Sequence, residues 1–234
     1  MRNKKFVLGV ILVFFLFVTP SNAQEEDTDT ALWTSIGIIY EASDKWTFGL
    51  EEQLRFKDNI GAIDQYFTEL SAGYAIFKNA ELGVGLRYIR RNDNRGNIQG
   101  YEDRLRFQID ASYKHKLGRL SFKHRLRYQN RNELGISADE GDIARQRLRF
   151  KTAISYNIQN WKLDPKFSAE LFNGFAENQE SEFNKYRFTL ETAYKFKQAG
   201  RIRVFYRYED EFNITDPKAA HIIGVGYRYT IKNR

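Results

Sequence analysis

The segment Tyr101–Tyr113, YEDRLRFQIDASY, decides the fold class because its residues alternate between two kinds of side chain. A β-strand points successive side chains to opposite faces, whereas a helix repeats every 3.6 residues. One face carries Tyr101, Leu105, Phe107, Ile109, Ala111 and Tyr113, and the other carries Glu102, Arg104, Arg106, Gln108, Asp110 and Ser112. The pattern predicts a strand with one apolar and one charged face.

The same alternation recurs from Trp46 to Ile231, and a weaker copy precedes it. We predict eleven such segments: 32–40, 45–57, 64–77, 80–91, 101–116, 120–131, 143–156, 161–172, 185–196, 201–212 and 220–231. Most reach the length of about 9–11 residues that a tilted membrane strand needs. The sequence therefore predicts an all-β chain, an antiparallel transmembrane β-barrel.

The N-terminus has the three parts of a secretory signal peptide, which we assign to residues 1–23. Basic residues precede an apolar run over 6–18, and Ser21-Asn22-Ala23 resembles a cleavage site. The alternative, a transmembrane helix, is disfavoured because this run is shorter than the roughly 20 residues that span a bilayer. We predict an acidic, flexible segment at 24–31 on the periplasmic side, and a barrel over 32–234.

Composition narrows the function classes. The chain has no cysteine, so it has neither disulfides nor the acylated cysteine of a lipoprotein. Removing the signal peptide takes away Arg2, Lys4 and Lys5 and no acid, which lowers the net charge from +7 to +4. This bias is too mild to indicate a nucleic-acid partner. Mean hydropathy of -0.60 fits both a soluble protein and a barrel, because barrel strands are apolar on one side only.

The connections between segments also alternate in length. Those at 44, 78–79, 117–119, 157–160 and 197–200 are short, whereas those at 57–63, 92–100, 132–142, 173–184 and 213–219 are longer and more polar. Short periplasmic turns opposite long external loops are typical of bacterial outer-membrane barrels. A soluble sandwich has no reason to sort its loops in this way.

Aromatic residues at the ends of the apolar faces predict the two girdles that lie at lipid headgroups. We assign to these girdles Trp46, Tyr66, Tyr74, Tyr101, Tyr113, Tyr186, Tyr194 and Tyr229. The number of strands stays open at ten to twelve. Ten strands beginning and ending in the periplasm satisfy the even number usual for such barrels. The segment 32–40 is then one too many, and it either has a partner that the pattern does not reveal or closes a twelve-strand wall in an irregular way.

The chain resembles a family of uncharacterised bacterial outer-membrane β-barrels, a domain of unknown function (DUF 2490). The stretches that carry the resemblance are LWTSIGIIYEASDKWTFGLEEQLRF at 32–56, AELGVGLRYIRR at 80–91, PKFSAELF at 165–172 and RIRVFYRYEDEF at 201–212. The resemblance covers nearly the whole predicted mature chain, and it implies an outer-membrane barrel with no assigned activity. One departure is the C-terminus, where Lys232-Asn233-Arg234 follows the aromatic residues on which such barrels usually end.

The charged face is rich in arginine, and one phrase occurs three times, at Arg104-Leu-Arg, Arg125-Leu-Arg and Arg147-Leu-Arg. We predict that these arginines lie at similar heights in the external half of the lumen. The full predicted belt is Arg55, Arg87, Arg104, Arg106, Arg125, Arg127, Arg147, Arg149, Arg187 and Arg207. Inward acids that would pair with it are Glu51, Glu69, Asp110, Glu170, Glu191 and Glu209.

The belt has two interpretations. In the first, the arginines and acids fill a narrow lumen with a structural network of ion pairs. In the second, surplus arginines select or bind an anionic solute, as rings of basic residues do in anion pores. Inward glycines at 83, 85, 224 and 226 fit either close packing or a thinned wall that leaves space for a solute.

Catalysis has little support in the sequence. Its three histidines are His115, His124 and His221; the last two share the apolar parity and the first ends a strand. A lipid-modifying site at His124 is the enzymatic alternative, against a histidine that snorkels towards headgroups. No serine elbow, phosphate loop or metal-ligand spacing is found.

We therefore expect a monomeric outer-membrane barrel, embedded in lipid, without cofactor or nucleic-acid partner. Its expected role is structural, or passive transport of small, preferentially anionic solutes. The alternative is an interaction protein that binds through the external loop at 132–142, which carries Glu133, Asp139, Glu140 and Asp142. A solvated loop explains those acids equally well.

Overall fold

The computed structural model describes residues 28–94, 99–136, 144–175, 181–197 and 199–233. Over these ranges the chain forms eleven strands: β1 (Thr28–Glu41), β2 (Trp46–Lys57), β3 (Ala62–Phe77), β4 (Ala80–Asp93), β5 (Gly100–Leu117), β6 (Leu120–Glu133), β7 (Arg145–Tyr156), β8 (Lys166–Phe175), β9 (Glu182–Lys195), β10 (Arg201–Glu211) and β11 (Ala219–Lys232). The predicted signal peptide lies outside the described residues. Among the described residues, no helix has the length and apolar character needed to cross a membrane.

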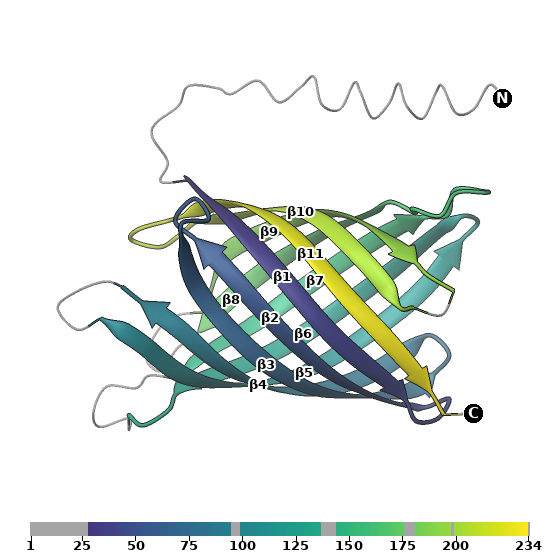
Figure 1. Ribbon diagram of the computed structural model, residues 1–234, viewed down its shortest axis with the longest axis horizontal. Coiled ribbons are helices and arrows are strands. Elements are labelled where there is room, and N and C mark those ends of the chain that lie inside the picture. Colours follow the sequence, from purple (N-terminus) through teal and green to yellow (C-terminus); the bar gives the residue numbers. More distant parts are fainter. Residues whose placement is uncertain (1–27, 95–98, 137–143, 176–180, 198, 234) are drawn as a thin grey trace, which may run out of the picture.

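The strands close into a single barrel in which each strand pairs with its neighbour in the chain (Figure 1). The predicted all-β barrel and its ten to twelve strands are confirmed. The prediction of a wholly antiparallel wall was wrong at one place, where β1 pairs with β11 in parallel. An odd number of alternating strands makes the first and last run in the same direction, so closure joins them in parallel. The segment that lacked a partner is thus the strand that closes the barrel.

The start of β1 and the end of β11 lie at opposite ends of the barrel, as Figure 1 shows. The start of β1 lies at the long-loop end, where Ile60 N donates to Thr30 O at 3.0 Å and Asn59 N donates to Asp29 Oδ1 at 2.7 Å. The end of β11 lies at the short-turn end, where Asn233 N donates to Glu41 O at 2.9 Å. The sequence predicts that the segment before β1 lies in the periplasm and that the long loops lie outside the cell. These two predictions cannot both be correct, because β1 begins beside the long loops.

Two predicted boundaries change by four residues or more. Residues 28–31, assigned to the flexible segment, belong to β1. The predicted strand at 161–172 begins instead at Lys166, after a turn in which Trp161 N donates to Ile158 O at 3.1 Å. Pro165 has no N–H to donate to a sheet, which explains why β8 starts after it.

The alternation separates an apolar, exposed outer face from a packed inner face. Outward Leu70 is 56% exposed, whereas inward Phe67 on the same strand is 1% exposed. The inner face contains an apolar cluster at the β1–β11 seam, made of Ala31, Trp33, Phe205 and Ile222. The structure thus encloses a lumen whose lining is the polar parity of each strand, interrupted by a few aromatic residues.

Candidate functional site

The centre of the lumen is a carboxylate held by three arginines. Glu170 of β8 has a side chain that is 2% exposed, and its oxygens lie 2.8 Å from Arg125, 2.9 Å from Arg149 and 3.3 Å from Arg187. These arginines come from β6, β7 and β9, so one acid joins four strands. A buried charge in this arrangement stabilises the fold only because its charge and its hydrogen-bond acceptors are matched.

Two further predicted acids also contact predicted arginines. Glu69 Oε2 accepts from Arg87 Nε at 2.6 Å and lies 3.5 Å from Arg106 Nη2. Asp110 forms a two-point contact with Arg127, whose Nη2 donates to Oδ2 at 2.6 Å. A two-point contact of this kind orients the guanidinium as well as neutralising it.

Of the three remaining predicted acids, Glu209 pairs with a predicted arginine, since its Oε1 lies 2.5 Å from Arg187 Nη2. The other two acids take partners outside the predicted belt. Glu51 pairs with Arg228 at 2.9 Å, and Glu191 pairs with Lys166 at 3.2 Å. Both of these bases have inward parity on their strands, the signal by which the sequence could have identified them.

Three predicted arginines have no ion pair among the described residues. Arg55 places its guanidinium carbon 3.5 Å from the ring centroid of Trp33, and Arg207 lies 4.7 Å from the same ring. Arg147 makes neither an ion pair nor a hydrogen bond with another described side chain. The last of the ten, Arg104, contacts Glu102 and Glu133, neither of which belongs to the predicted acids.

Inward aromatic residues are the part of the site that sequence reasoning missed. Arg87 lies 3.5 Å above the ring of Phe67, and Arg149 and Arg187 lie 4.5 Å and 4.7 Å from the ring of Phe172. Cation–π contacts of desolvated arginines are worth roughly 2 kcal/mol each. The available signal was parity, because these rings interrupt the charged face of their strands.

The arginines, acids and rings fill the middle of the lumen. Phe67, Gln108, Gln129, Glu170, Phe172 and Phe205 all have inward side chains, and each is buried. Gln108 Oε1 accepts from Gln129 Nε2 at 3.0 Å and from Arg127 Nη1 at 3.1 Å, which links β5 and β6 across their polar faces. This central layer leaves little room for a wide water-filled pore at mid-height.

The predicted common height of the three arginine phrases was wrong. Arg104 lies opposite Glu133, eight residues beyond Arg125 along β6. At about 3.3 Å per residue and a tilt near 40°, the two are separated by roughly 20 Å of height. The second and third phrases do lie at similar heights, because Arg127 lies opposite Arg149. The belt is therefore slanted, with its first phrase near the long loops.

The inner faces of β6 and β7 form a cationic wall. Their inward basic residues are Lys123, Arg125, Arg127, Arg131, Arg145, Arg147, Arg149 and Lys151, and Glu133 is the one acid on these two strands. Several like charges lie directly opposite one another, including Arg125 with Lys151 and Arg127 with Arg149. Like charges in this position destabilise a sheet. The cationic wall therefore lowers the stability of the barrel, and acids on neighbouring strands offset this effect only in part.

The short-turn end of the lumen opens into a cationic vestibule with a volume of about 1260 Å³. Its charged lining is Glu41, Glu81, Lys114, Lys166, Glu191, Lys195, Lys197, Arg201, Arg203, Arg228 and Lys232. Cations outnumber acids in this set. Lysine is the commonest base here, whereas arginine dominates the central layer, so the lumen has two cationic zones of different chemistry.

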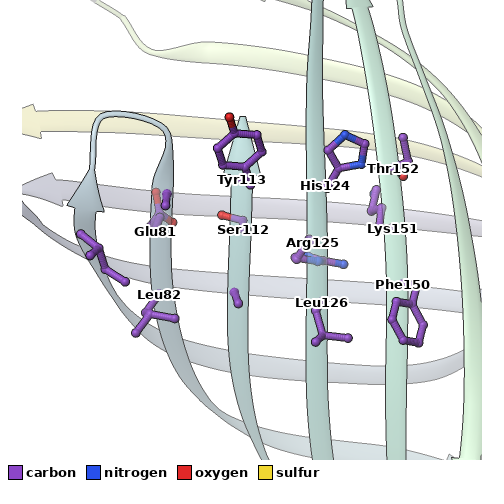
Figure 2. Close-up of a pocket in the computed structure, with 13 residues that line it drawn as sticks. Glu81, Leu82, Ser112, Tyr113, His124, Arg125, Leu126, Phe150, Lys151 and Thr152 are labelled. Carbon is purple, nitrogen blue, oxygen red and sulfur yellow. Dashed lines mark hydrogen bonds between the residues drawn. The ribbon is translucent and has the colours of Figure 1, made fainter. Parts of the chain in front are cut away.

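The outer wall carries an apolar groove of about 480 Å³ near the short-turn end (Figure 2). Figure 2 shows Tyr113, His124 and Thr152 side by side on three neighbouring strands. His124 Nδ1 lies 3.1 Å from Thr152 Oγ1, and its ring stacks on His115 at 5.4 Å. These contacts fix the ring at the edge of the groove.

The predicted girdle residues lie on the outer face. Trp46 packs against Tyr74 with ring centroids 4.8 Å apart, and Tyr66 packs against Tyr101 at 6.0 Å. The others, Tyr113, Tyr186, Tyr194 and Tyr229, also have outward parity. In the described ranges, no group of three or more His, Asp or Glu side chains is arranged to hold a metal ion.

Comparison with known proteins places these features in a family. A family model described as a protein of unknown function (DUF2490) matches residues 30–220. No curated protein matches the sequence. Two solved structures, both of in-vitro folded OmpT, an outer membrane protein of Vibrio cholerae, and one of them in a trimer form, are similar at 16% and 15% identity with a TM-score of 0.43. Each alignment covers 74% of this chain and 52% of OmpT, so the chain spans about half the length of these proteins.

Proposed function

The chain belongs to the DUF2490 family of proteins of unknown function, and we propose that it is a monomeric outer-membrane barrel that passes small anions through a narrow lumen. The long loops face outwards and the short turns face the periplasm, as in other bacterial outer-membrane barrels. An anion from the periplasm would enter the vestibule and then meet the arginine-rich central layer.

The observation that carries the proposal is the surplus of positive charge on the inner wall. Lys114 of β5 lies opposite Lys123 of β6, and neither makes an ion pair within 4.0 Å in the described part of the chain. Such pairs cost stability in the absence of an anion. Basic rings and clusters favour anion entry because they lower the electrostatic barrier to a negative solute.

The central layer limits the size of the solute. Because its side chains are buried and bonded to one another, passage of even a small anion requires local rearrangement of arginines and glutamines. We therefore expect low conductance, with a strong preference for inorganic anions over larger organic ones.

The test is conductance of the purified, refolded protein in a planar bilayer, with a salt gradient to read ion selectivity. Anion-selective steps should appear, and a double variant Lys114→Gln/Lys123→Gln should move the reversal potential towards that of a non-selective pore. Lys45→Gln, in the exposed turn between β1 and β2, removes the same kind of charge outside the lumen and should leave selectivity unchanged. Cation-selective steps, or equal shifts in both variants, would contradict the proposal.

The second candidate is a structural barrel with a permanently filled lumen. The buried contact of Glu170 with three arginines favours it, because such a network resists rearrangement. A protein that refolds fully and shows no conductance with any anion would support this candidate over transport.

Two other roles have less support. Of the loop acids proposed for an interaction protein, Glu133 lies 3.9 Å from inward Arg104, and Asp139, Glu140 and Asp142 lie outside the described residues. For lipid modification, His124 contacts Thr152 and His115, an arrangement that favours an anchoring role at the membrane interface. We expect His124→Ala to leave a lipid-modification assay at its background level.

A further inference from the structure

We propose that the loop-end half of the lumen contains a binding site for a multivalent oxyanion of the phosphate class. The site is an arginine cluster defined as Arg104 and Arg106 of β5, Arg131 of β6, and Arg145 and Arg147 of β7. The inference deepens the proposed function, on which it rests for the idea that surplus lumen charge serves an anion. It adds a location at the opposite end from the vestibule and a ligand class.

The first observation is a continuous row of arginines across four strands. In the register of the sheet, Arg87 lies opposite Arg106, Arg106 opposite Arg131, and Arg131 opposite Arg145. Residues directly opposite one another have Cβ atoms about 4.5–5.5 Å apart, and like charges there repel. Glu69 contacts Arg87 and Arg106 at one end of the row. At the other end, Arg131 and Arg145 have no ion pair among the described residues, and the inward acid nearby, Glu133, lies against Arg104.

The second observation is the lack of partners within the cluster. Among the described residues, the side chains of Arg131, Arg145 and Arg147 make no hydrogen bond or ion pair. The strongest electrostatic neighbours of Arg131 are four other arginines, two of them Arg145 and Arg147. A set of guanidinium groups that face one another without an anion is the arrangement that an oxyanion would neutralise.

The third observation concerns buried N–H groups. The side chain of Arg104 is 9% exposed, and although its Nη2 contacts Glu102, its Nη1 is buried without a hydrogen-bond partner. Arg106 Nε is likewise buried without a partner. A buried donor with no acceptor destabilises the fold, and an oxygen-rich ligand supplies the missing acceptors.

The composition of the cluster indicates the ligand class. Arginine presents a planar set of donors that matches two oxygens of a phosphate or carboxylate, whereas lysine acts as a point charge. The cluster contains five arginines and no lysine, in contrast to the vestibule. Several guanidinium groups within one row favour a ligand with more than one charge, so phosphate or pyrophosphate should bind better than chloride.

The site is reached from the long-loop end. Arg145 is exposed at the start of β7, and Arg131 lies directly opposite it near the end of β6. The phosphate group that enters belongs either to a free solute or to a lipid headgroup that reaches over the rim. Because all five arginines have inward parity, a free solute fits the geometry better.

The experiment measures thermal unfolding of the refolded protein in detergent, with pyrophosphate as the probe and chloride at equal ionic strength as the reference. Pyrophosphate should raise the unfolding temperature in a saturable way. A double variant Arg131→Gln/Arg147→Gln should weaken the apparent affinity by about a hundredfold, since it removes at least two charged hydrogen bonds and each is worth about a factor of ten. Without pyrophosphate, this variant should unfold at the same or a higher temperature than the original protein, because it relieves repulsion.

A matched control is Lys195→Gln/Arg203→Gln, which removes two charges from the vestibule at the other end of the barrel. It should retain the pyrophosphate effect. Equal loss of the pyrophosphate effect in both variants would show that the effect is non-specific charge screening. If pyrophosphate did not stabilise the unmodified protein more than chloride does, the proposed site would be refuted. A phosphate-bearing lipid in mixed micelles provides the second arm, and protection by the lipid but not by pyrophosphate would assign the site to a headgroup.

The two proposals fail separately. Saturable binding of pyrophosphate in a barrel that does not conduct would retain this site and refute transport. Anion-selective conductance with no specific effect of pyrophosphate would do the opposite.

Discussion

Replacement of Glu170 by glutamine should be among the most destabilising changes in the lumen. The substitution keeps the volume but removes the charge shared by Arg125, Arg149 and Arg187, whose side chains are only 21%, 10% and 13% exposed. Of the three, Arg187 retains Glu209 as a partner. Breaking a buried ion pair by removing one partner costs about 3–5 kcal/mol because the other charge is left uncompensated. With three partners affected and some relaxation of the arginines, we expect a loss of about 4 kcal/mol in the free energy of unfolding.

The assay is equilibrium unfolding in urea of the protein folded into lipid vesicles, followed by tryptophan fluorescence. Trp33 reports on the lumen because Arg55 and Arg207 stack on its ring. A second change, Arg149→Gln in the Glu170→Gln background, should recover part of the loss, since it removes one of the uncompensated charges.

Glu191→Gln is the matched control for Glu170. Glu191 has partners that are more exposed, with Lys166 34% and Arg203 29% exposed, and exposed pairs contribute about 0–1 kcal/mol. We expect a loss of about 1 kcal/mol or less. If Glu170→Gln were no more harmful than Glu191→Gln, the central network would not stabilise the barrel, and the reasoning from burial would be refuted.

Two other predictions concern packing and topology. A Cβ at Gly224 would lie 1.9 Å from Phe205 Cζ, so Gly224→Ala should lower the unfolding free energy by about 1–3 kcal/mol, whereas Gly83→Ala, where the nearest atom is 3.5 Å away, should change it by less than about 1 kcal/mol in the same urea assay. Because the chain has no native cysteine, single cysteines at Thr28 and Asn233 can be labelled in intact cells with a membrane-impermeant maleimide. Label should reach position 28 and not position 233, and the reverse pattern would invert the proposed orientation.

Most of the strands could be predicted because their signal is local. In Tyr101–Tyr113, alternation alone assigns each side chain to the lipid or the lumen, and the structure has β5 over Gly100–Leu117. The predicted start of β8 at residue 161 was wrong, because Trp161 continues the alternation although the strand begins only at Lys166, after Pro165. Local patterns therefore locate strands well and their ends less well.

The contacts in the lumen required the register between strands. Arg104 and Arg125 belong to the same repeated phrase, and yet their heights differ by roughly 20 Å because the turn between β5 and β6 sets their offset. The stacking of Arg55 on Trp33 joins β2 to β1 and depends on the same kind of pairing. An inward aromatic ring is visible in the sequence, but its arginine partner is not.

The sequence by itself determined the strands, the separation into a lipid-facing and a lumen-facing parity, and the wealth of basic residues on the inner face, because a period of two is a property of consecutive residues. The tertiary structure alone decided how the barrel closes, that β1 and β11 run in parallel, and which arginines acquire an acid, a ring or no partner. These depend on pairing between residues 191 positions apart, and on a register that no single strand encodes.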